Sequence, residues 1–169
     1  MPPPPTARIE FRLWRTADVE LATKLWCDPR VMRFIGGPYS RDEVLARLAR
    51  EESNDAAHAI QYWPVFVADT FAGCCGLRPH ETEPGAHFRE IGFQFLPGFW
   101  GAGYASEAAR AVIAYAFDVL DVAALFAGHH PQNDASRALL ARLGFAEIGT
   151  HYFARTGLQH PWHRLDRRR

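Results

Sequence analysis

The stretch of sequence that decides the fold is Leu96-Pro-Gly-Phe-Trp-Gly101-Ala-Gly103-Tyr-Ala-Ser-Glu107, where a strand ends, a loop turns and a long helix begins. Glycines at positions 101 and 103 let the backbone approach a ligand closely. The N–H groups of the first helical turn have no partners within the helix, and the helix dipole adds positive potential there. The stretch therefore predicts a site for an anion such as a pyrophosphate, unless the two glycines only form a tight turn.

Two other phosphate-binding motifs are excluded by the same stretch. A P-loop has the pattern GxxxxGK[ST], and the only lysine of the chain, Lys24, is far from these glycines. A Rossmann fingerprint needs a third Gly or Ala where Ser106 stands and an acidic residue at the end of the following strand. A Rossmann fingerprint also follows the first strand of a parallel unit, whereas the glycines of this loop come after residue 100. The loop therefore belongs to a different kind of anion site.

The first third of the chain is expected to contain a strand followed by helices. Residues 9–14 alternate between apolar and polar side chains, as a half-buried strand does. Asp18 can cap a first helix, which the pair Asp28-Pro29 interrupts. A short second helix is expected to run through Phe34.

A third helix and then a run of strands follow. Ser40 and Glu43 match a capping box that opens the third helix. Strands are expected at 63–68, 74–78 and 87–96, with a turn at 69–73 and an exposed loop at 79–86. Three strands in a row predict an antiparallel meander.

Beyond the glycine loop, the sequence predicts a long helix, a strand, another helix and a final pair of strands. Apolar positions recur at helical spacing for about four turns from Ala105 onward. Asn133 or Asp134 caps the next helix, which ends at Gly144, a residue suited to a left-handed stop. The strands are expected at 122–127, 145–153 and 158–165. The whole order predicts an α+β fold with one strand–helix–strand passage at its centre.

The composition is typical of one soluble domain. The 169 residues are 48% hydrophobic, and we expect a single domain at 8–166 behind a disordered, proline-rich tail at 1–7. Nineteen basic and nineteen acidic side chains give a net charge of zero, which argues against nucleic acid or anionic lipid as a partner. The sequence shows no signal peptide and no apolar run of ~18 residues, so we expect a cytoplasmic protein with no membrane partner.

The cysteines and histidines raise the hypotheses of a nucleophile and of a metal site, and neither is favoured. Cys74 and Cys75 lie in an expected strand with no activating histidine nearby in sequence, so we interpret them as small buried side chains. The histidine pairs within 129–130 and 160–163 lack partners at known ligand spacing. We expect them at the surface or at strand ends, and we expect no metal site.

Several short motifs, in their order and spacing, resemble the GNAT family of N-acetyltransferases. The resemblance covers nearly the whole chain and is to the branch that includes the ribosomal-protein N-terminal alanine and serine acetyltransferases. It implies a mostly antiparallel mixed sheet of about six or seven strands, flanked by helices, that splays where the cofactor enters. The motifs are Asp28-Pro-Arg-Val-Met32, Cys75-Gly-Leu-Arg-Pro79, Glu90-Ile-Gly92, Trp100-Gly-Ala-Gly-Tyr-Ala-Ser-Glu-Ala-Ala109, Asn133-Asp-Ala-Ser136 and Leu143-Gly-Phe145.

The resemblance also implies acetyl-CoA as the cosubstrate. The strand end at Phe95 and Leu96 would pair with the pantetheine arm like another strand, and Asn133 would contact the same arm. Arg142 could meet the CoA phosphates or remain a solvated arginine. Ala102 stands where relatives often carry Lys, Arg or Gln, so pyrophosphate binding must depend more on the backbone. The loop residues assigned to the cofactor are Trp100, Gly101, Ala102, Gly103, Tyr104 and Ala105.

Two residues are candidates for the chemistry that the resemblance implies, which is direct attack of a neutral amine on the thioester without a covalent enzyme intermediate. Glu90 could accept the ammonium proton directly or through water, or it could only anchor structure or substrate. Ser136 could stabilise or protonate the leaving thiolate, or it could only satisfy the first turn of its helix.

The sequence leaves the acceptor open. It could be the N-terminal amine of a protein, or a small amine, amino acid or antibiotic, and the chain could act as a monomer or a homodimer. Two other functions are compatible with the motifs: a regulatory module that binds acyl-CoA without transfer, and an acyltransferase for a longer acyl chain.

Overall fold

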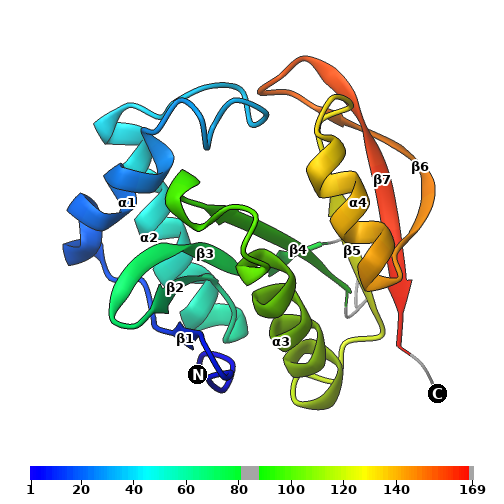
Figure 1. The fold of residues 1–169 in the computed structure, drawn as a ribbon, viewed down its shortest axis with the longest axis horizontal. Coiled ribbons are helices and arrows are strands. Elements are labelled where there is room, and N and C mark those ends of the chain that lie inside the picture. Colours follow the sequence, from blue (N-terminus) through cyan, green and yellow to red (C-terminus); the bar gives the residue numbers. More distant parts are fainter. Residues whose placement is uncertain (81–87, 168–169) are drawn as a thin grey trace.

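The computed structural model describes residues 1–80 and 88–167 of the chain, and seven strands in it form a single mixed sheet with helices on both sides (Figure 1). The strands are β1 Glu10–Phe11, β2 Tyr62–Val67, β3 Thr70–Pro79, β4 Phe88–Phe95, β5 Ala124–Gly128, β6 Ala146–Phe153 and β7 Leu158–Asp166. The helices are α1 Val19–Trp26, α2 Arg41–His58, α3 Tyr104–Asp118 and α4 Asp134–Leu143, with short 3-10 turns η1 Thr16–Asp18 and η2 Pro97–Phe99.

The sheet order confirms the expected α+β fold. The order is β1-β2-β3-β4-β5-β7-β6, and β2, β3 and β4 form the antiparallel meander. Helix α3 connects β4 to β5, and these two strands are the only parallel neighbours in the described part of the sheet. This is the strand–helix–strand passage that the sequence predicts.

The sheet separates two apolar cores, because neighbouring residues of a strand point to opposite faces. On one face Tyr62 and Cys74 pack with α1 and α2, and on the other Trp63 and Cys75 pack with α3 and α4. The interpretation of both cysteines as small buried side chains is confirmed. Burial raises the pKa of the Cys74 thiol to about 12, which keeps it protonated and unreactive.

Hydrogen bonds at the helix ends confirm the local capping signals. The backbone N–H of Glu43 donates to Ser40 Oγ at 3.3 Å, and the N–H of Ser40 donates to the Glu43 carboxylate at 2.7 Å. This reciprocal pair is the capping box of α2. Asn133, rather than Asp134, caps α4 by accepting from the N–H of Ser136 at 3.1 Å.

The prediction of a short second helix through Phe34 is wrong, because this segment forms turns. The Asp28 carboxylate accepts from the backbone N–H of Arg30 at 2.8 Å, and the Asp28 carbonyl accepts from the N–H of Met32 at 3.0 Å. An aspartate that binds the backbone just after it favours a turn over a continued helix.

The first strand is also shorter than expected, because it covers Glu10–Phe11 rather than 9–14. Phe11 pairs with Val65, and the next position on β2 is Pro64. The Pro64 carbonyl accepts from the N–H of Arg12 at 3.0 Å, but proline has no N–H to return. The ladder therefore ends there.

The turn between β2 and β3 is tighter than the expected 69–73. Ala68 and Asp69 have positive φ angles of 44° and 60°, and β3 begins at Thr70, opposite Val67. A two-residue turn of this kind matches the twist of two antiparallel strands. Residues 81–86 of the expected exposed loop lie outside the described residues.

Strands β4 and β5 diverge soon after they meet. They pair only over 88–90 of β4 and 124–126 of β5, although β4 continues to Phe95 and β5 to Gly128. Figure 1 shows the two strands separating, with α4 lying over β5 at one side of the opening. The splay that the resemblance implies is therefore present.

The N-terminal segment 1–7 contacts α3. The hydroxyl of Tyr115 donates to the Met1 carbonyl at 2.7 Å, and the hydroxyl of Thr6 donates to Glu107 at 2.5 Å. The disorder of this segment and the domain boundary at residue 8 stay predictions. None of the described helices is both long and apolar enough to cross a membrane.

A buried ion pair ties α2 to β2. Glu51 is only 2% exposed, and its carboxylate accepts from Arg47 Nε at 2.5 Å and from the backbone N–H of Tyr62 at 2.8 Å. The Arg47 guanidinium also lies over the rings of Trp26 and Tyr62. Because both charges are removed from water, each is tolerated only while its partner stays in place.

Glu51→Ala is therefore expected to lower the free energy of unfolding by about 3–5 kcal/mol, since it leaves the Arg47 charge buried and unpaired. Urea unfolding followed by circular dichroism measures this change. Ser53→Ala, at an exposed position of the same helix, is the control and should change stability by less than about 0.5 kcal/mol. If the two variants unfold alike, the ion pair does not have this role.

Candidate functional site

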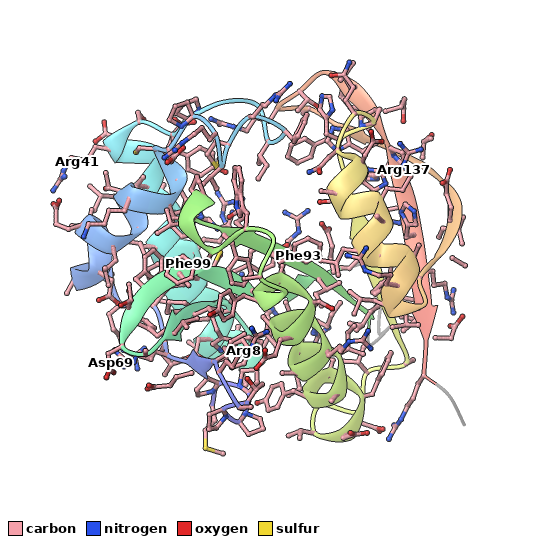
Figure 2. The ribbon with its side chains drawn as sticks, viewed as in Figure 1. Arg8, Arg41, Asp69, Phe93, Phe99 and Arg137 are labelled. Atoms are coloured by element: carbon pink, nitrogen blue, oxygen red, sulfur yellow. The ribbon has the colours of Figure 1, made fainter. Side chains whose placement is uncertain are left out.

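Two cavities open where β4 and β5 diverge, and they meet at a shared wall. One, of about 590 Å³, lies between the glycine loop and α4, and we call it the loop cavity. The other, of about 450 Å³, is called the histidine cavity after its lining residues His129, His130, His151 and His160. Figure 2 shows one wall residue, Phe93, between β4 and α4. The residues that line both cavities are Phe34, Ile35, Phe93, Gln94, Asn133 and Ser136.

The backbone at the floor of the loop cavity has a geometry that suits an anion. Gly101 and Gly103 have left-handed φ angles of 74° and 83°, which other residues adopt only at a cost. A Cβ at Gly101 would meet no atom within 4 Å, so the backbone there is open to a ligand. Residues 104–106, the first turn of α3, line the cavity together with Trp100. The N–H groups of such a first turn favour a negatively charged group.

Arg8, which sequence reasoning missed, supports this loop. Its Nη1 donates to the carbonyl of Ala102 at 3.1 Å, and its guanidinium forms an ion pair with Glu107 at 2.6 Å and lies 4.4 Å from the Tyr104 ring centre. Burial raises the pKa of Glu107, but the hydrogen bonds from Thr6 and Arg8 outweigh it and hold this pKa below its ordinary value. Arg8 is 94 residues from Ala102, so no local signal could reveal the contact.

Two residues that the resemblance assigns to the cofactor lie outside the described lining of both cavities. Ala102 is exposed, and the N–H of Leu96 donates to a β3 carbonyl at 2.8 Å while its side chain packs in the α1/α2 core. Phe95 does line the loop cavity, and its carbonyl accepts from Trp100 Nε1 at 2.7 Å. Phe93 and Phe95, rather than Leu96, thus form the wall along β4.

Two guanidinium groups lie at the loop cavity. Arg142, in the last turn of α4, lines it. Arg30 lines it as well, held by Asp28 at 2.8 Å. Arg30 belongs to the motif Asp28-Pro-Arg-Val-Met32. Its position at the loop cavity could not be predicted, because it depends on the turn that replaces the expected second helix.

Glu90 lies where β4 leaves β5. It is the last β4 residue paired with β5, opposite Phe126, and its carboxylate accepts from Arg78 Nη2 at 2.5 Å. The Glu90 side chain is 13% exposed and lines the histidine cavity. Two residues further, a Cβ on Gly92 would fall 2.3 Å from the hydroxyl oxygen of Tyr62, so only glycine fits there.

Asn133 and Ser136 stand at the shared wall, at the N-terminus of α4. The side-chain oxygen of Asn133 is used in the helix cap, while its amide nitrogen remains able to donate. Ser136 lines the histidine cavity together with Glu90. The structure thus brings the two catalytic candidates, which are far apart in sequence, to one cavity.

The expectation of histidines at the surface or at strand ends is wrong for His160 and His163, which lie within β7 and are only 7% and 4% exposed. His129 is also buried, at 5% exposure, but it does lie at the end of β5. They are covered because β5 pairs with β7, where Ala127 lies opposite His163 and the rings of His129 and His163 lie 5.1 Å apart. Within the described residues, no three or more His, Cys, Asp or Glu side chains form a group that could hold a metal ion.

Sequence comparison identifies a family and a named relative. The family model of an acetyltransferase (GNAT) domain matches residues 8–146. A protein of Aspergillus fumigatus, FsC-acetyl coenzyme A-N(2)-transacetylase, is 34% identical over 156 residues, which are 87% of this chain and 66% of that protein. The chain thus spans less than two thirds of that relative's length.

Solved structures share the fold. An acetyltransferase from Agrobacterium tumefaciens matches with a TM-score of 0.83 at 23% identity, over 99% of this chain and 95% of that chain. A ribosomal L7/L12 alpha-N-protein acetyltransferase in complex with coenzyme A matches with a TM-score of 0.81 at 16% identity, over 96% of each chain. At these identities the likeness concerns the fold alone.

The turn that carries Arg30 gives a prediction about pH. The hydrogen bond from the Arg30 side chain lowers the pKa of Asp28 to about 2, although burial acts in the opposite direction. Because the pKa is lowered in the folded chain, the stabilisation from this carboxylate is present above its ordinary pKa of about 3.9 and is lost as the pH falls towards 2. A carboxyl-carbon NMR titration of Asp28 should show a midpoint near 2. Arg30→Ala should return it towards the ordinary value, and an ordinary midpoint in the unaltered chain would contradict the ion pair.

Proposed function

This chain belongs to the GNAT family of acetyl-CoA-dependent N-acetyltransferases, and we propose that it acetylates a primary amine by direct attack in a ternary complex. The loop cavity receives acetyl-CoA, and the histidine cavity receives the amine. The observation that carries this proposal is the shared wall, where the two cavities meet at Phe93, Asn133 and Ser136. Two substrates held on either side of that wall can react without leaving the protein.

The residues around the loop cavity fit acetyl-CoA. The backbone at Gly101 and in the first turn of α3 suits the pyrophosphate, and Arg142 adds the positive charge that Ala102 lacks. Arg30, whose charge Asp28 balances, is a further guanidinium at this cavity. The edge of β4 near Phe93 has no β5 partner and can offer backbone groups to the pantetheine arm, as a sheet edge does to a peptide.

The chain's own residues supply the proton transfers. Acetyl-CoA provides an acetyl group activated as a thioester, and the amine nitrogen bonds to the acetyl carbon as the carbon–sulfur bond breaks. Ser136 stabilises or protonates the departing sulfur, and Glu90, paired with Arg78, accepts the proton that the amine must lose. Cys74 and Cys75 are buried in the two cores, in keeping with a transfer that needs no covalent enzyme intermediate.

The acceptor is either a protein N-terminus or a small-molecule amine. The ribosomal L7/L12 alpha-N-protein acetyltransferase is named for the first class, and the FsC-acetyl coenzyme A-N(2)-transacetylase is named for FsC and an N(2) nitrogen. Four arginines line the histidine cavity, and three of them are already paired, so among the described residues only Arg50 offers a positive charge without an ion pair. The cavity therefore does not demand a strongly charged acceptor. The pairs are Arg47 with Glu51, Arg78 with Glu90, and Arg155 with Glu43. We expect the chain to act as a monomer or a homodimer.

Acetyl-CoA at about 100 times its dissociation constant should raise the free energy of unfolding by roughly 2.7 kcal/mol, because it binds only the folded chain. For a domain of this size the melting temperature should rise by about 5–10 °C. Thermal unfolding with ATP and NADH as controls measures the effect. No shift at millimolar acetyl-CoA would overturn the assignment of the loop cavity.

Glu90→Gln and Ser136→Ala test the chemistry. Each should lower kcat by about a hundredfold or more while acetyl-CoA still binds, because each removes one proton transfer. Release of free CoA, followed with a thiol reagent and a panel of primary amines, measures kcat. Glu20→Gln and Ser53→Ala, at exposed positions of α1 and α2, are the matched controls.

The same assay separates the two alternative functions. A regulatory module would bind acetyl-CoA but release no CoA with any amine, and the two substitutions would not change its function. An acyltransferase for a longer chain would turn over propionyl- or succinyl-CoA faster than acetyl-CoA. Faster turnover of acetyl-CoA is the result that supports the proposal.

A further inference from the structure

The guanidinium of Arg8 contacts both the glycine loop and the helix that follows it. Its Nη1 donates to the carbonyl of Ala102 at 3.1 Å, while its Nε and Nη2 lie 2.7 Å and 2.6 Å from Oε2 of Glu107. The same group lies 4.4 Å from the ring centre of Tyr104, at the start of α3. Within the described chain, Arg8 is not one of the residues that line the loop cavity. Any effect of Arg8 on a ligand there must therefore pass through these neighbours.

The hydrogen bond to Ala102 fixes the orientation of one peptide group in the loop. The peptide between Ala102 and Gly103 is trans, so its C=O and its N–H point in opposite directions. Because the carbonyl points to Arg8, the N–H of Gly103 points away from Arg8. Gly103 lines the loop cavity, whereas Ala102 does not. Arg8 thus holds this peptide in the orientation that leaves its donor available to an anion in the cavity.

The loop needs such a contact because of its glycines. The peptide that Arg8 holds lies between Gly101 and Gly103, and a glycine backbone can adopt many other conformations. Nη2 of Arg8 also lies 3.6 Å from the position that a Cβ on Gly103 would take, so the guanidinium packs directly against the loop. A loop that is ordered before the ligand arrives loses less conformational entropy when the ligand binds.

Glu107 places a negative charge in the first turn of α3, close to the N–H groups that favour an anion. Its own backbone N–H donates to the carbonyl of Gly103 at 3.0 Å. Although burial opposes it, hydrogen bonds from Thr6 and Arg8 hold the pKa of Glu107 below its ordinary value, so the carboxylate is ionised at neutral pH. An uncompensated carboxylate in this turn would repel a phosphate. The positive charge of Arg8 compensates it.

Stability does not account for this arrangement. The side chains of Arg8 and Glu107 are 45% and 20% exposed. Ion pairs with this exposure contribute little to the free energy of unfolding, because water screens the two charges. Arg12 forms comparable exposed pairs with Glu10 and Asp69, and its guanidinium lies over the ring of Phe66 instead. Arg12 is therefore a matched control for Arg8.

We propose that Arg8 is a positioning residue for the binding of acetyl-CoA, an inference that rests on the proposed function. Through Nη1 it keeps the N–H of Gly103 turned towards the loop cavity. Through its ion pair it removes the charge of Glu107 that would repel the pyrophosphate. Arg8 takes no part in the acetyl transfer itself, so it should change the affinity for the cofactor and leave the rate of the chemistry unchanged.

Titration calorimetry with acetyl-CoA tests this role without an acceptor. Arg8→Ala should raise the Kd for acetyl-CoA about tenfold, because it removes the hydrogen bond that orients the loop and leaves the Glu107 charge uncompensated. Arg12→Ala removes exposed ion pairs of the same kind and should leave the Kd unchanged. The melting temperature of the ligand-free protein should change little in either variant. An equal Kd for the wild-type chain and Arg8→Ala would overturn the inference.

Two further variants test the two contacts separately. Adding Glu107→Gln to Arg8→Ala removes the uncompensated charge, so the double variant should bind acetyl-CoA about threefold more tightly than Arg8→Ala. If it binds no more tightly, the compensating role is overturned. Arg8→Lys keeps the charge but lacks the planar fork that reaches two acceptors, so its Kd should be about threefold above that of the wild type. A wild-type Kd in Arg8→Lys would overturn the role of the Ala102 contact, and this test remains if Arg8→Ala does not fold.

Kinetics with two acetyl donors separate a positioning role from a structural one. S-acetylpantetheine has the thioester but no pyrophosphate. With a primary amine that the wild-type chain accepts, Arg8→Ala should raise the KM for acetyl-CoA about tenfold at unchanged kcat, and its kcat/KM for S-acetylpantetheine should equal that of the wild type. Equal losses with both donors, or a lower kcat, would give Arg8 a general structural role and overturn the inference. If the wild-type chain binds no acetyl-CoA, the proposed function fails and the inference fails with it.

Discussion

The early divergence of β4 and β5 is the constraint on which the site depends. Pairing over only 88–90 and 124–126 leaves the facing edges of both strands without sheet partners beyond that point. Backbone N–H and C=O groups that leave water need other partners, so a sheet that opens in its middle must find them elsewhere. Trp100 satisfies one of them by donating to the carbonyl of Phe95. The remaining β4 groups are left for a ligand that lies along the edge as a strand does.

Features decided by residues close in sequence could be predicted well. The capping box of Ser40 and Glu43 and the Asn133 cap depend on side chains three residues away, and the glycine loop depends on its own backbone angles. The meander and the long helix follow from apolar periodicity, which reports which face of each element is buried. Glu90 and Ser136 could be predicted as candidates because the resemblance assigns roles to their motifs. The fold brings both residues to one cavity.

Features decided by distant partners could not be predicted. Arg8 supports the glycine loop from almost a hundred residues away, and the burial of His163 follows from the β5–β7 pairing, which no local pattern reports. The first strand ends early because Pro64 of another strand has no N–H to share. The turn that brings Arg30 to the loop cavity depends on backbone contacts of Asp28 that compete with a helix. In each case the partner that decides the structure is distant in sequence, or the competing conformation is a turn. Neither leaves a signal in helical or strand periodicity.

The first turn of α3 also orients the cofactor that the proposed function requires. The loop cavity offers helix N–H groups and Arg142, together with Arg30, whose charge Asp28 balances. In the histidine cavity Glu90 likewise balances Arg78, while Arg50 adds a positive charge. The N–H groups of the first turn of α3 are therefore what favours a phosphate in the loop cavity. Acetyl-CoA carries its charges at one end and its uncharged thioester at the other, so the thioester is the part left to lie beside Ser136 at the shared wall. Under the proposed function, the first turn of α3 thus sets the direction in which the cofactor enters, before any contact with the acceptor.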